Sequence, residues 1–214
     1  MIVERYGIQL KSLDKKHLQD LRAWRNRPDT RNYLEFQEHI DEREQEEWYA
    51  RMDHTTNLLF TYHQNGKVQG FVQLKNIDLT RGTAEAGIIH GNEETRDSPV
   101  AIIAILVLME LAFDVLGMER LRAKIKHDNA TVIAMNQQLG YEKSEIQSDP
   151  KFPYYEVSKS RFSSQTKRFR TMLAKRHGKE FSIKTTDSDA YWLRFFQSKA
   201  TNEFFDSVAI ISNV

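Results

Sequence analysis

The spacing of hydrophobic residues along the chain predicts an alternation of strands and helices. Strands are expected where apolar and polar residues alternate, and helices where apolar residues recur every three or four positions. The predicted strands cover residues 6–13, 58–63, 68–79, 83–90, 121–126, 141–146, 154–158 and 208–211. The predicted helices cover residues 14–26, 41–52, 100–113, 129–139 and 187–197. Up to residue 158 the order is βααβββαβαββ, which favours an α/β domain.

The helix predicted over residues 100–113 is apolar on all sides and is interrupted only by Glu110. A helix without a polar face must be covered all round, so we expect it to lie on the sheet beneath other elements. It is too short to cross a membrane, which takes about 20 apolar residues. Ser98 and Pro99 fit its N-cap and first helical position, and Gly117 fits its C-cap.

Composition narrows the functional classes. The chain has 214 residues with a formal charge of +1, which argues against a general nucleic-acid binder because such proteins need a dense cationic face. Cysteine is absent, which excludes disulfides and thiolate metal sites and suits the cytoplasm. The seven histidines form no ligand-spaced pair, so no metal is expected. The first residues have no signal-peptide pattern, and neither a leader nor a membrane partner is expected.

The last fifty residues differ from the rest, and we divide the chain into a domain over residues 1–162 and a helical C-terminal extension over residues 163–214. Residues 163–179 are rich in lysine and arginine, with apolar residues at helical spacing. Residues 191–196 are rich in aromatic side chains and should pack on the domain or on the mate in a homodimer. The basic stretch is either a solvated helix face or a docking surface for an acidic partner.

Two groups of motifs carry a family resemblance. The segments Leu111-Ala112-Phe113, Glu119-Arg120-Leu121 and Asn136-Gln137-Gln138-Leu139-Gly140-Tyr141, with Leu116 and Asn129, resemble the GNAT superfamily of N-acetyltransferases. Trp24-Arg25-Asn26-x-Pro28, followed by Trp48, resembles the branch that acetylates amino sugars on nucleotide carriers, as in the pseudaminic acid pathway. Ribosomal-protein acetyltransferases share much of this pattern. The resemblance covers about residues 5–160 and implies a mostly antiparallel central sheet flanked by helices.

The resemblance implies acetyl-CoA as the acetyl donor and indicates where it binds. The pyrophosphate loop of the family corresponds here to Arg96, Asp97, Ser98, Pro99, Val100 and Ala101. Pro99 replaces a glycine and removes one N–H, although a helix N-terminus suits phosphate in general. The strand over residues 83–90 corresponds to the strand whose backbone pairs with the pantetheine amides, which indicates Ile88 and Ile89. Asn129 and Asn136 are expected to bind the CoA arm, and helix capping is the alternative for Asn129.

Glu85 and His90 are the candidate catalytic residues, because the attacking amine must lose a proton and the leaving thiolate must gain one. Their strand positions differ in parity, so they should point to opposite faces of the sheet. The usual acid of the family is a tyrosine at the position of Asn136, so this chain departs from the pattern there. The proton for the thiolate can then come from water or from a residue of the extension. Alternatively, the enzyme relies on orientation of the reactants alone.

Arg25, Asn26 and Lys75 are the candidate substrate-binding residues, since a guanidinium pairs with phosphate or carboxylate. The predicted function is acetyl transfer from acetyl-CoA to a primary amine by direct attack, with an amino sugar on a nucleotide carrier as the favoured acceptor. A protein N-terminus is the alternative acceptor. A catalytically degenerate acyl-CoA-binding or scaffold protein, and an adaptor that uses the basic extension, are the non-enzymatic alternatives.

Overall fold

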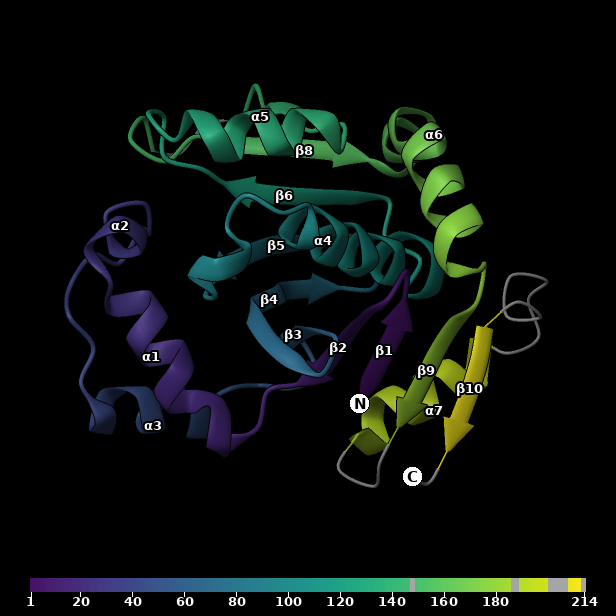
Figure 1. Cartoon of the computed structure of the whole chain (residues 1–214), viewed down its shortest axis with the longest axis horizontal. Helices are drawn as coiled ribbons and strands as arrows, with labels where there is room; N and C mark the ends of the chain where they lie inside the picture. Colours follow the sequence, from purple (N-terminus) through teal and green to yellow (C-terminus); the bar gives the residue numbers. More distant parts are fainter. Residues whose placement is uncertain (147–148, 186–188, 200–207, 213–214) are drawn as a thin grey trace.

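The computed structural model describes residues 1–146, 149–185, 189–199 and 208–212 (Figure 1). Its strands are β1 (Ile2–Arg5), β2 (Ile8–Ser12), β3 (Leu58–Gln64), β4 (Lys67–Asp78), β5 (Thr83–His90), β6 (Arg120–Lys124), β7 (Glu142–Lys143), β8 (Tyr154–Ser158), β9 (Phe181–Thr185) and β10 (Val208–Ser212). In this part of the chain they form one sheet in the order β10-β9-β1-β2-β3-β4-β5-β6-β8-β7. Only the neighbours β5–β6 and β9–β10 are parallel. The predicted α/β architecture with a mostly antiparallel sheet is therefore confirmed.

Helices cover both faces of the sheet. They are α1 (Leu18–Asn26), α2 (Pro28–Arg31), α3 (Glu42–Ala50), α4 (Val100–Glu110), α5 (Ala130–Gln138), α6 (Lys159–His177) and α7 (Ala190–Lys199). Leu18 and Leu21 of α1 pack on Leu59 and Phe71 of the sheet. The opposite face is covered by α4 (Figure 1). The two faces therefore have separate hydrophobic clusters, and a strand residue belongs to one or the other by its parity.

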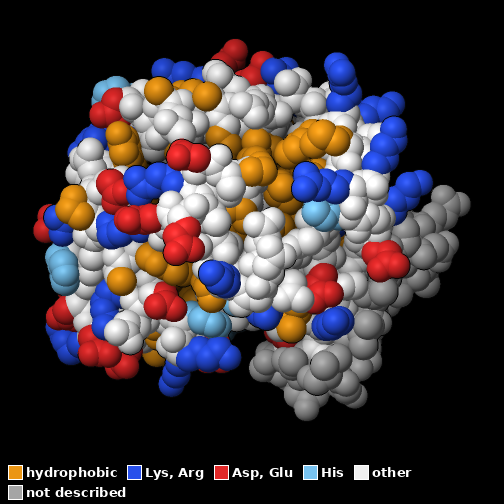
Figure 2. Space-filling model, in the orientation of Figure 1, with side chains coloured by type: hydrophobic (Ala, Val, Ile, Leu, Met, Phe, Trp, Pro, Cys, Tyr) orange, Lys and Arg blue, Asp and Glu red, His pale blue; other side chains and the backbone are white. Residues whose placement is uncertain are grey.

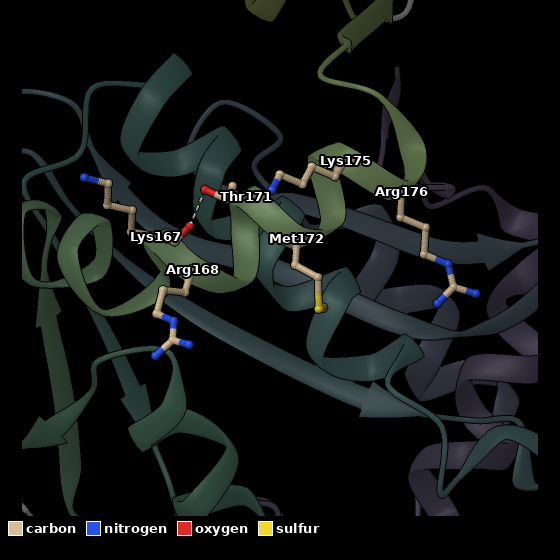
Figure 3. Close-up of a pocket in the computed structure, with 6 residues that line it drawn as sticks. All are labelled: Lys167, Arg168, Thr171, Met172, Lys175 and Arg176. Atoms are coloured by element: carbon tan, nitrogen blue, oxygen red, sulfur yellow. Dashed lines mark hydrogen bonds between the residues drawn. The ribbon is translucent and has the colours of Figure 1, made fainter.

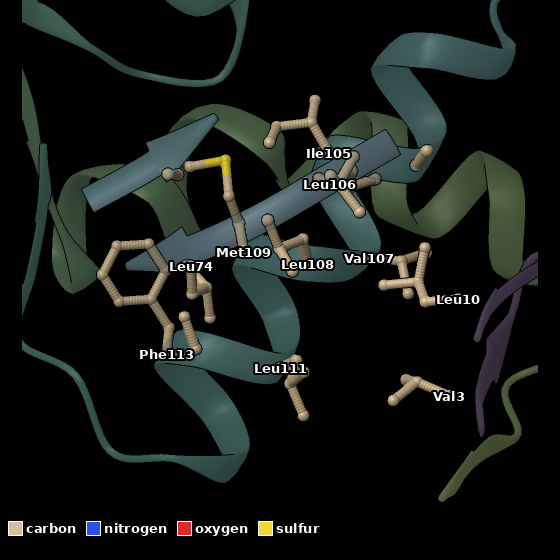
Figure 4. Packing of buried hydrophobic residues seen from close by; sticks show 14 of the residues in the cluster. Val3, Leu10, Leu74, Ile105, Leu106, Val107, Leu108, Met109, Leu111 and Phe113 are labelled. Carbon is tan, nitrogen blue, oxygen red and sulfur yellow. The ribbon is translucent and has the colours of Figure 1, made fainter. Parts of the chain in front are cut away.

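The predicted central helix is confirmed as α4, and every residue from Ile103 to Glu110 is buried. Val3, Leu10 and Leu74 of the sheet belong to the same hydrophobic cluster (Figure 4). The last turn, Leu111–Val115, is π-helical, and Gly117 follows with a φ of 73°, as a residue that ends a helix often does.

Glu110 is the acidic residue in this apolar helix, and its carboxylate is only 1% exposed. Arg5 Nε lies 2.7 Å from Glu110 Oε2, and Arg170 Nε lies 2.5 Å from Oε1. The Tyr6 hydroxyl donates a hydrogen bond to Oε1 over 3.1 Å. Burial raises the pKa of Glu110, while the two guanidinium groups oppose that rise. These contacts join the segment after β1 and helix α6 to α4.

The N-terminal segment differs from the prediction of one strand over residues 6–13. Two strands, β1 and β2, form a hairpin, and Tyr6 and Gly7 make its turn with φ values of 54° and 76°. Gly7 suits such a turn because it has no Cβ. Residues 2–5 were missed because a strand of four residues is too short for alternation to stand out.

The C-terminal extension packs on its own chain. α6 begins at Lys159, so the predicted boundary at residue 162 falls inside this helix. β9 pairs with β1, which places the two segments side by side (Figure 1). Trp192 of α7 is buried and its Nε1 donates to the carbonyl of His54 over 2.8 Å. Of the helix predicted over residues 187–197, residues 187 and 188 lie outside the described residues. The strand predicted over residues 208–211 is confirmed as β10.

Candidate active site

β5 and β6 run parallel and separate after a short paired stretch. Their pairing covers only residues 83–85 of β5 and 120–122 of β6. β5 continues to His90 along β4, and β6 continues to Lys124 along β8. The two strands therefore enclose a gap in the sheet that is closed at Glu85 and open beyond it. Parallel strands normally keep an even ladder, so this separation leaves main-chain groups of β5 without a strand partner at that edge.

Alternation along β5 determines which main-chain groups face the gap. The N–H of Gly91 donates to the carbonyl of Gln69. In an antiparallel pair every second residue bonds to the partner strand, so the main-chain groups of odd-numbered residues in β5 bond to β4. Those of even-numbered residues point away from β4. Ile88 therefore directs its N–H and C=O into the gap. Ile89 directs its main chain to β4, and its side chain packs with the α1 cluster. Of the two predicted residues, Ile88 lines the gap and Ile89 does not.

The predicted phosphate loop leads from β5 to α4. The structure shifts the predicted cap by one residue, because Pro99 is the N-cap and the helix begins at Val100. The Ser98 hydroxyl donates to the Thr95 carbonyl over 2.7 Å and accepts from the Val100 N–H over 3.4 Å. Pro99 fits where it stands because it needs no hydrogen-bond acceptor there.

The first turn of α4 presents free amide groups at the end of the loop. The helical ladder starts with the N–H of Ile103, which donates to the Pro99 carbonyl. The N–H groups of Ala101 and Ile102 precede that bond and point out of the helix end. Such a helix end carries a partial positive charge that favours an anion. Of the predicted loop residues, Ala101 therefore offers a free N–H at the helix end, whereas the N–H of Val100 is bonded to Ser98.

Arg96 and Asp97 lie on the exposed part of this loop. The Arg96 guanidinium is paired with Asp29 of α2, with Nη2 2.7 Å from Oδ2. Both side chains are about half exposed, so the ion pair is weak and easily exchanged. The same Nη2 lies 3.9 Å from Glu93 Oε1, so Arg96 is held by two carboxylates beside the loop. Asp97 adds a negative charge beside it.

Glu85 stands where the pairing of β5 and β6 ends. Its carboxylate is 17% exposed, and Lys75 Nζ lies 3.2 Å from Oε2. Asn76 donates from Nδ2 to Oε1 over 3.2 Å. Lys75 is opposite Glu85 in the register of β4 and β5, so the structure brings a predicted base and a predicted substrate cation together.

His90 lies at the far end of β5 and on the other face, as strand parity predicts. Its Nδ1 is 2.5 Å from the Tyr62 hydroxyl, and its Nε2 is 3.3 Å from Thr95 Oγ1. Burial raises the pKa of Tyr62, so the hydroxyl stays protonated beside Nδ1. Burial lowers the pKa of His90, which favours the neutral ring. Both ring nitrogens therefore have partners within the chain.

Arg25 and Asn26 lie at the end of α1. Arg25 donates to the carbonyl of Phe36 over 3.2 Å, and its guanidinium carbon is 5.4 Å from the centre of that ring. Burial lowers the pKa of Arg25, and within the described residues it has no ion pair with a carboxylate. Asn26 instead braces a loop, since its side chain accepts from the N–H of Ile40 and donates to the carbonyl of the same residue.

Arg27 is a site residue that the sequence analysis missed. Its Nη1 and Nη2 donate to the carbonyls of Gly91 and His90, each over 2.9 Å. On the other side of the gap, Lys124 of β6 lies 2.6 Å from Glu35. The segment from Arg27 to Glu35 therefore bridges the ends of β5 and β6. An arginine between two helices gives no periodic signal, so its role is visible only in three dimensions.

The two asparagines predicted to bind the CoA arm have internal partners. Asn129 is the N-cap of α5, and its side chain accepts from the Val132 N–H over 3.2 Å, as the alternative interpretation expected. Asn136 is buried and donates to the Val132 carbonyl over 2.9 Å. Neither side chain is directed to the gap by these bonds.

No helix among the described residues combines the length and apolar character that a membrane span needs. No group of three or more histidine, aspartate or glutamate side chains in them is placed to hold a metal ion.

Comparisons with known proteins agree with this geometry. Residues 8–142 match a family model described as an acetyltransferase (GNAT) domain. Among solved structures, a GCN5-related N-acetyltransferase from Brucella melitensis has a TM-score of 0.66 at 23% identity, covering 82% of this chain and 86% of that one. FdhC, a nucleotide-linked sugar GNAT, has a TM-score of 0.66 at 19% identity, with coverages of 81% and 98%. Spermidine N-acetyltransferase from Vibrio cholerae, solved with CoA and spermine, has a TM-score of 0.66 at 17% identity, with coverages of 73% and 98%. No curated protein matches the sequence significantly.

Proposed function

Because the chain belongs to the acetyltransferase (GNAT) domain family, we propose that it transfers acetyl from acetyl-CoA to the primary amine of a small anionic acceptor in the cytoplasm. The gap between β5 and β6 carries this proposal. It offers main-chain groups of Ile88 to the pantetheine arm, a helix end to the pyrophosphate, and Glu85 at its closed end. These three features lie in the order that an extended cofactor requires.

The reaction needs two proton movements around one bond exchange. The amine nitrogen attacks the thioester carbon, so a C–N bond forms and the C–S bond breaks. The amine loses one proton, and the departing thiolate gains one. We assign to Glu85 the role of accepting the amine proton, directly or through water. His90 has both ring nitrogens engaged and Asn136 carries no acidic proton, so solvent water supplies the proton to the thiolate.

Arg25 supports an acceptor that carries negative charge. A half-buried guanidinium without a carboxylate partner is poorly solvated, and an anionic ligand relieves that cost. A nucleotide-linked amino sugar combines a diphosphate with a primary amine and is the acceptor class we favour. The similarity to FdhC supports the same class. A polyamine is cationic, as Arg25 is, so Arg25 does not favour its binding.

Calorimetric titration with acetyl-CoA tests the donor site. Micromolar binding is expected, and Ser98→Glu should abolish it because the new charge faces the pyrophosphate at the helix end. A conservative Ser98→Ala variant serves as the control and should keep most of the affinity. If the wild-type chain does not bind at millimolar acetyl-CoA, the proposal fails.

Kinetics with a panel of acceptors test the base and the acceptor class. Glu85→Gln should lower kcat/KM by about 10²–10⁴-fold at neutral pH, whereas Glu46→Gln on the exposed face of α3 should leave it unchanged. Arg25→Gln should raise KM for a nucleotide-linked amino sugar more than tenfold and Arg25→Lys much less, since lysine keeps the charge. Faster turnover with spermidine or a peptide N-terminus would refute the acceptor class and leave the donor site intact.

A further inference from the structure

α6 carries a strongly cationic face that the acetyl-transfer site does not use. The helix lies beyond residues 8–142, the part that matches the acetyltransferase family. Lys167, Arg168, Lys175 and Arg176 are all exposed on this helix. Figure 2 shows the cationic side chains along α6 next to a patch of apolar side chains. We call the face formed by these four residues with Thr171 and Met172 the α6 face.

The α6 face is an open surface with two rows of side chains. A shallow depression of about 570 Å³, open to solvent, lies over the six residues, with no carboxylate among them. In Figure 3, the side chains of Arg168, Met172 and Arg176 project from the same side of the helix, with the methionine between the two guanidinium groups. Lys167, Thr171 and Lys175 form the second row. Residues four apart lie on one face of a helix, so each row repeats every turn.

The charges of the α6 face are not neutralised within the chain. Among the described residues, none of the four cations takes part in a salt bridge. Arg170 of the same helix points inward instead and is paired with Glu110 and Asp114. The four like charges along nearly three turns give this face a positive potential, which attracts an anionic partner.

We propose that the α6 face is a docking site for an acidic, amphipathic helix of another protein. Its cation pairs are eight residues apart, which is about 12 Å along the helix. A partner helix fits when it carries carboxylates at positions i and i+8 and an apolar side chain at i+4. The carboxylates pair with the arginines, and the apolar side chain packs on Met172, which is 55% exposed.

The centre of the α6 face favours a peptide over a nucleic acid. Methionine is flexible and polarisable and adapts to varied apolar partners. A phosphate backbone has no apolar group to place there, and a chain of formal charge +1 attracts polyanions weakly at long range. The most acidic helix of the chain, α3, does not fit as a second copy. It has Trp48 four residues after Glu44, but Met52 stands where the second carboxylate is required.

A designed peptide tests the proposal. The probe is a fluorescein-labelled helical peptide of about 20 residues with glutamate pairs eight positions apart and a leucine midway. Fluorescence anisotropy with the full chain should give micromolar binding at 50 mM salt and weaker binding at 150 mM. Arg168→Glu combined with Arg176→Glu should weaken binding about tenfold or more, and Met172→Ser about threefold or more.

Matched controls keep the test specific. Lys15→Glu combined with Lys67→Glu changes two exposed cations elsewhere and should leave the affinity unchanged. All variants should bind acetyl-CoA as the wild-type chain does if that chain binds it, and should keep its melting temperature. Equal binding of a peptide with serine in place of the leucine would show a non-specific cation patch and overturn the proposal. Tighter binding of a single-stranded oligonucleotide of equal charge, or a dimer lost in the double arginine variant, would also overturn it.

Discussion

His63 predicts a pH dependence of stability that can be worked from the structure. Its ring is buried on β3 on the α1 side of the sheet, with Nε2 3.0 Å from Thr61 Oγ1. Burial is the largest cause that lowers its pKa to about 4, and Lys11, His17 and Lys16 lower it further. The unfolded chain returns His63 to an ordinary pKa near 6.5.

Proton binding determines whether acid raises or lowers the stability. Between pH 6.5 and pH 4 the unfolded chain binds a proton at His63 that the folded chain excludes. Stability is therefore full above pH 6.5 and falls as the pH drops toward 4. Between pH 7 and pH 5 the loss from this group is about 2 kcal/mol. In a chain of this size that loss lowers Tm by about 4–8 °C.

Thermal and urea unfolding at pH 7, 6 and 5 measure this effect, with the chain compared to two variants. His63→Gln keeps a hydrogen-bonding group beside Thr61 but does not titrate, so its stability should change about 2 kcal/mol less than that of the wild-type chain over this range. His127→Gln removes an exposed histidine and should follow the wild-type chain. If His63→Gln loses as much stability as the wild-type chain, burial of His63 does not cause the pH dependence.

Three further predictions concern the site and its support. Asp29→Asn releases Arg96 for the cofactor and should tighten acetyl-CoA binding about 1.4- to 5-fold in a calorimetric titration, because the exposed pair is worth about 0.2–1 kcal/mol; unchanged affinity would show that the pair does not compete. Arg170→Ala leaves Glu110 with one guanidinium and should cost about 3 kcal/mol in urea unfolding, and a change below 1 kcal/mol would contradict that role. Gly70→Ala places a Cβ against the carbonyl of the neighbouring strand and 2.7 Å from a buried tyrosine ring, so Tm should fall by several degrees, and an unchanged Tm would contradict the close contact.

The hydrophobic pattern of the sequence was sufficient to predict the elements that bury a long apolar face. α4 was predicted because its ten apolar residues must be buried on all sides. The strands of the β3–β4 hairpin were also predicted, and Asn65 and Gly66 join them with φ values of 51° and 76°. The hairpin at Tyr6 was missed because a strand of four residues with a tight turn leaves no periodic trace. Such short elements owe their structure to their neighbours in the sheet.

The site was less predictable because its chemistry depends on partners that are distant in sequence. Strand parity correctly separated Glu85 from His90. Parity alone did not show that Tyr62 and Thr95 occupy both nitrogens of His90, since those residues come from other elements. Arg27 was missed for the same reason, because its acceptors are the carbonyls at the end of β5.

The pairing of β1 with β9 has a consequence for how the molecule assembles during synthesis. Val3 is paired with Ile183, so the two strands meet across 180 positions of sequence. Contacts of such long range form late, because closing so large a loop costs entropy before the pairing returns any stability. While the chain leaves the ribosome, β1 is an unprotected sheet edge until β9 has emerged. Exposed edges pair with strands of other chains, so this protein should aggregate more readily during synthesis than a shorter chain that ends after β8. It should therefore depend more on chaperones.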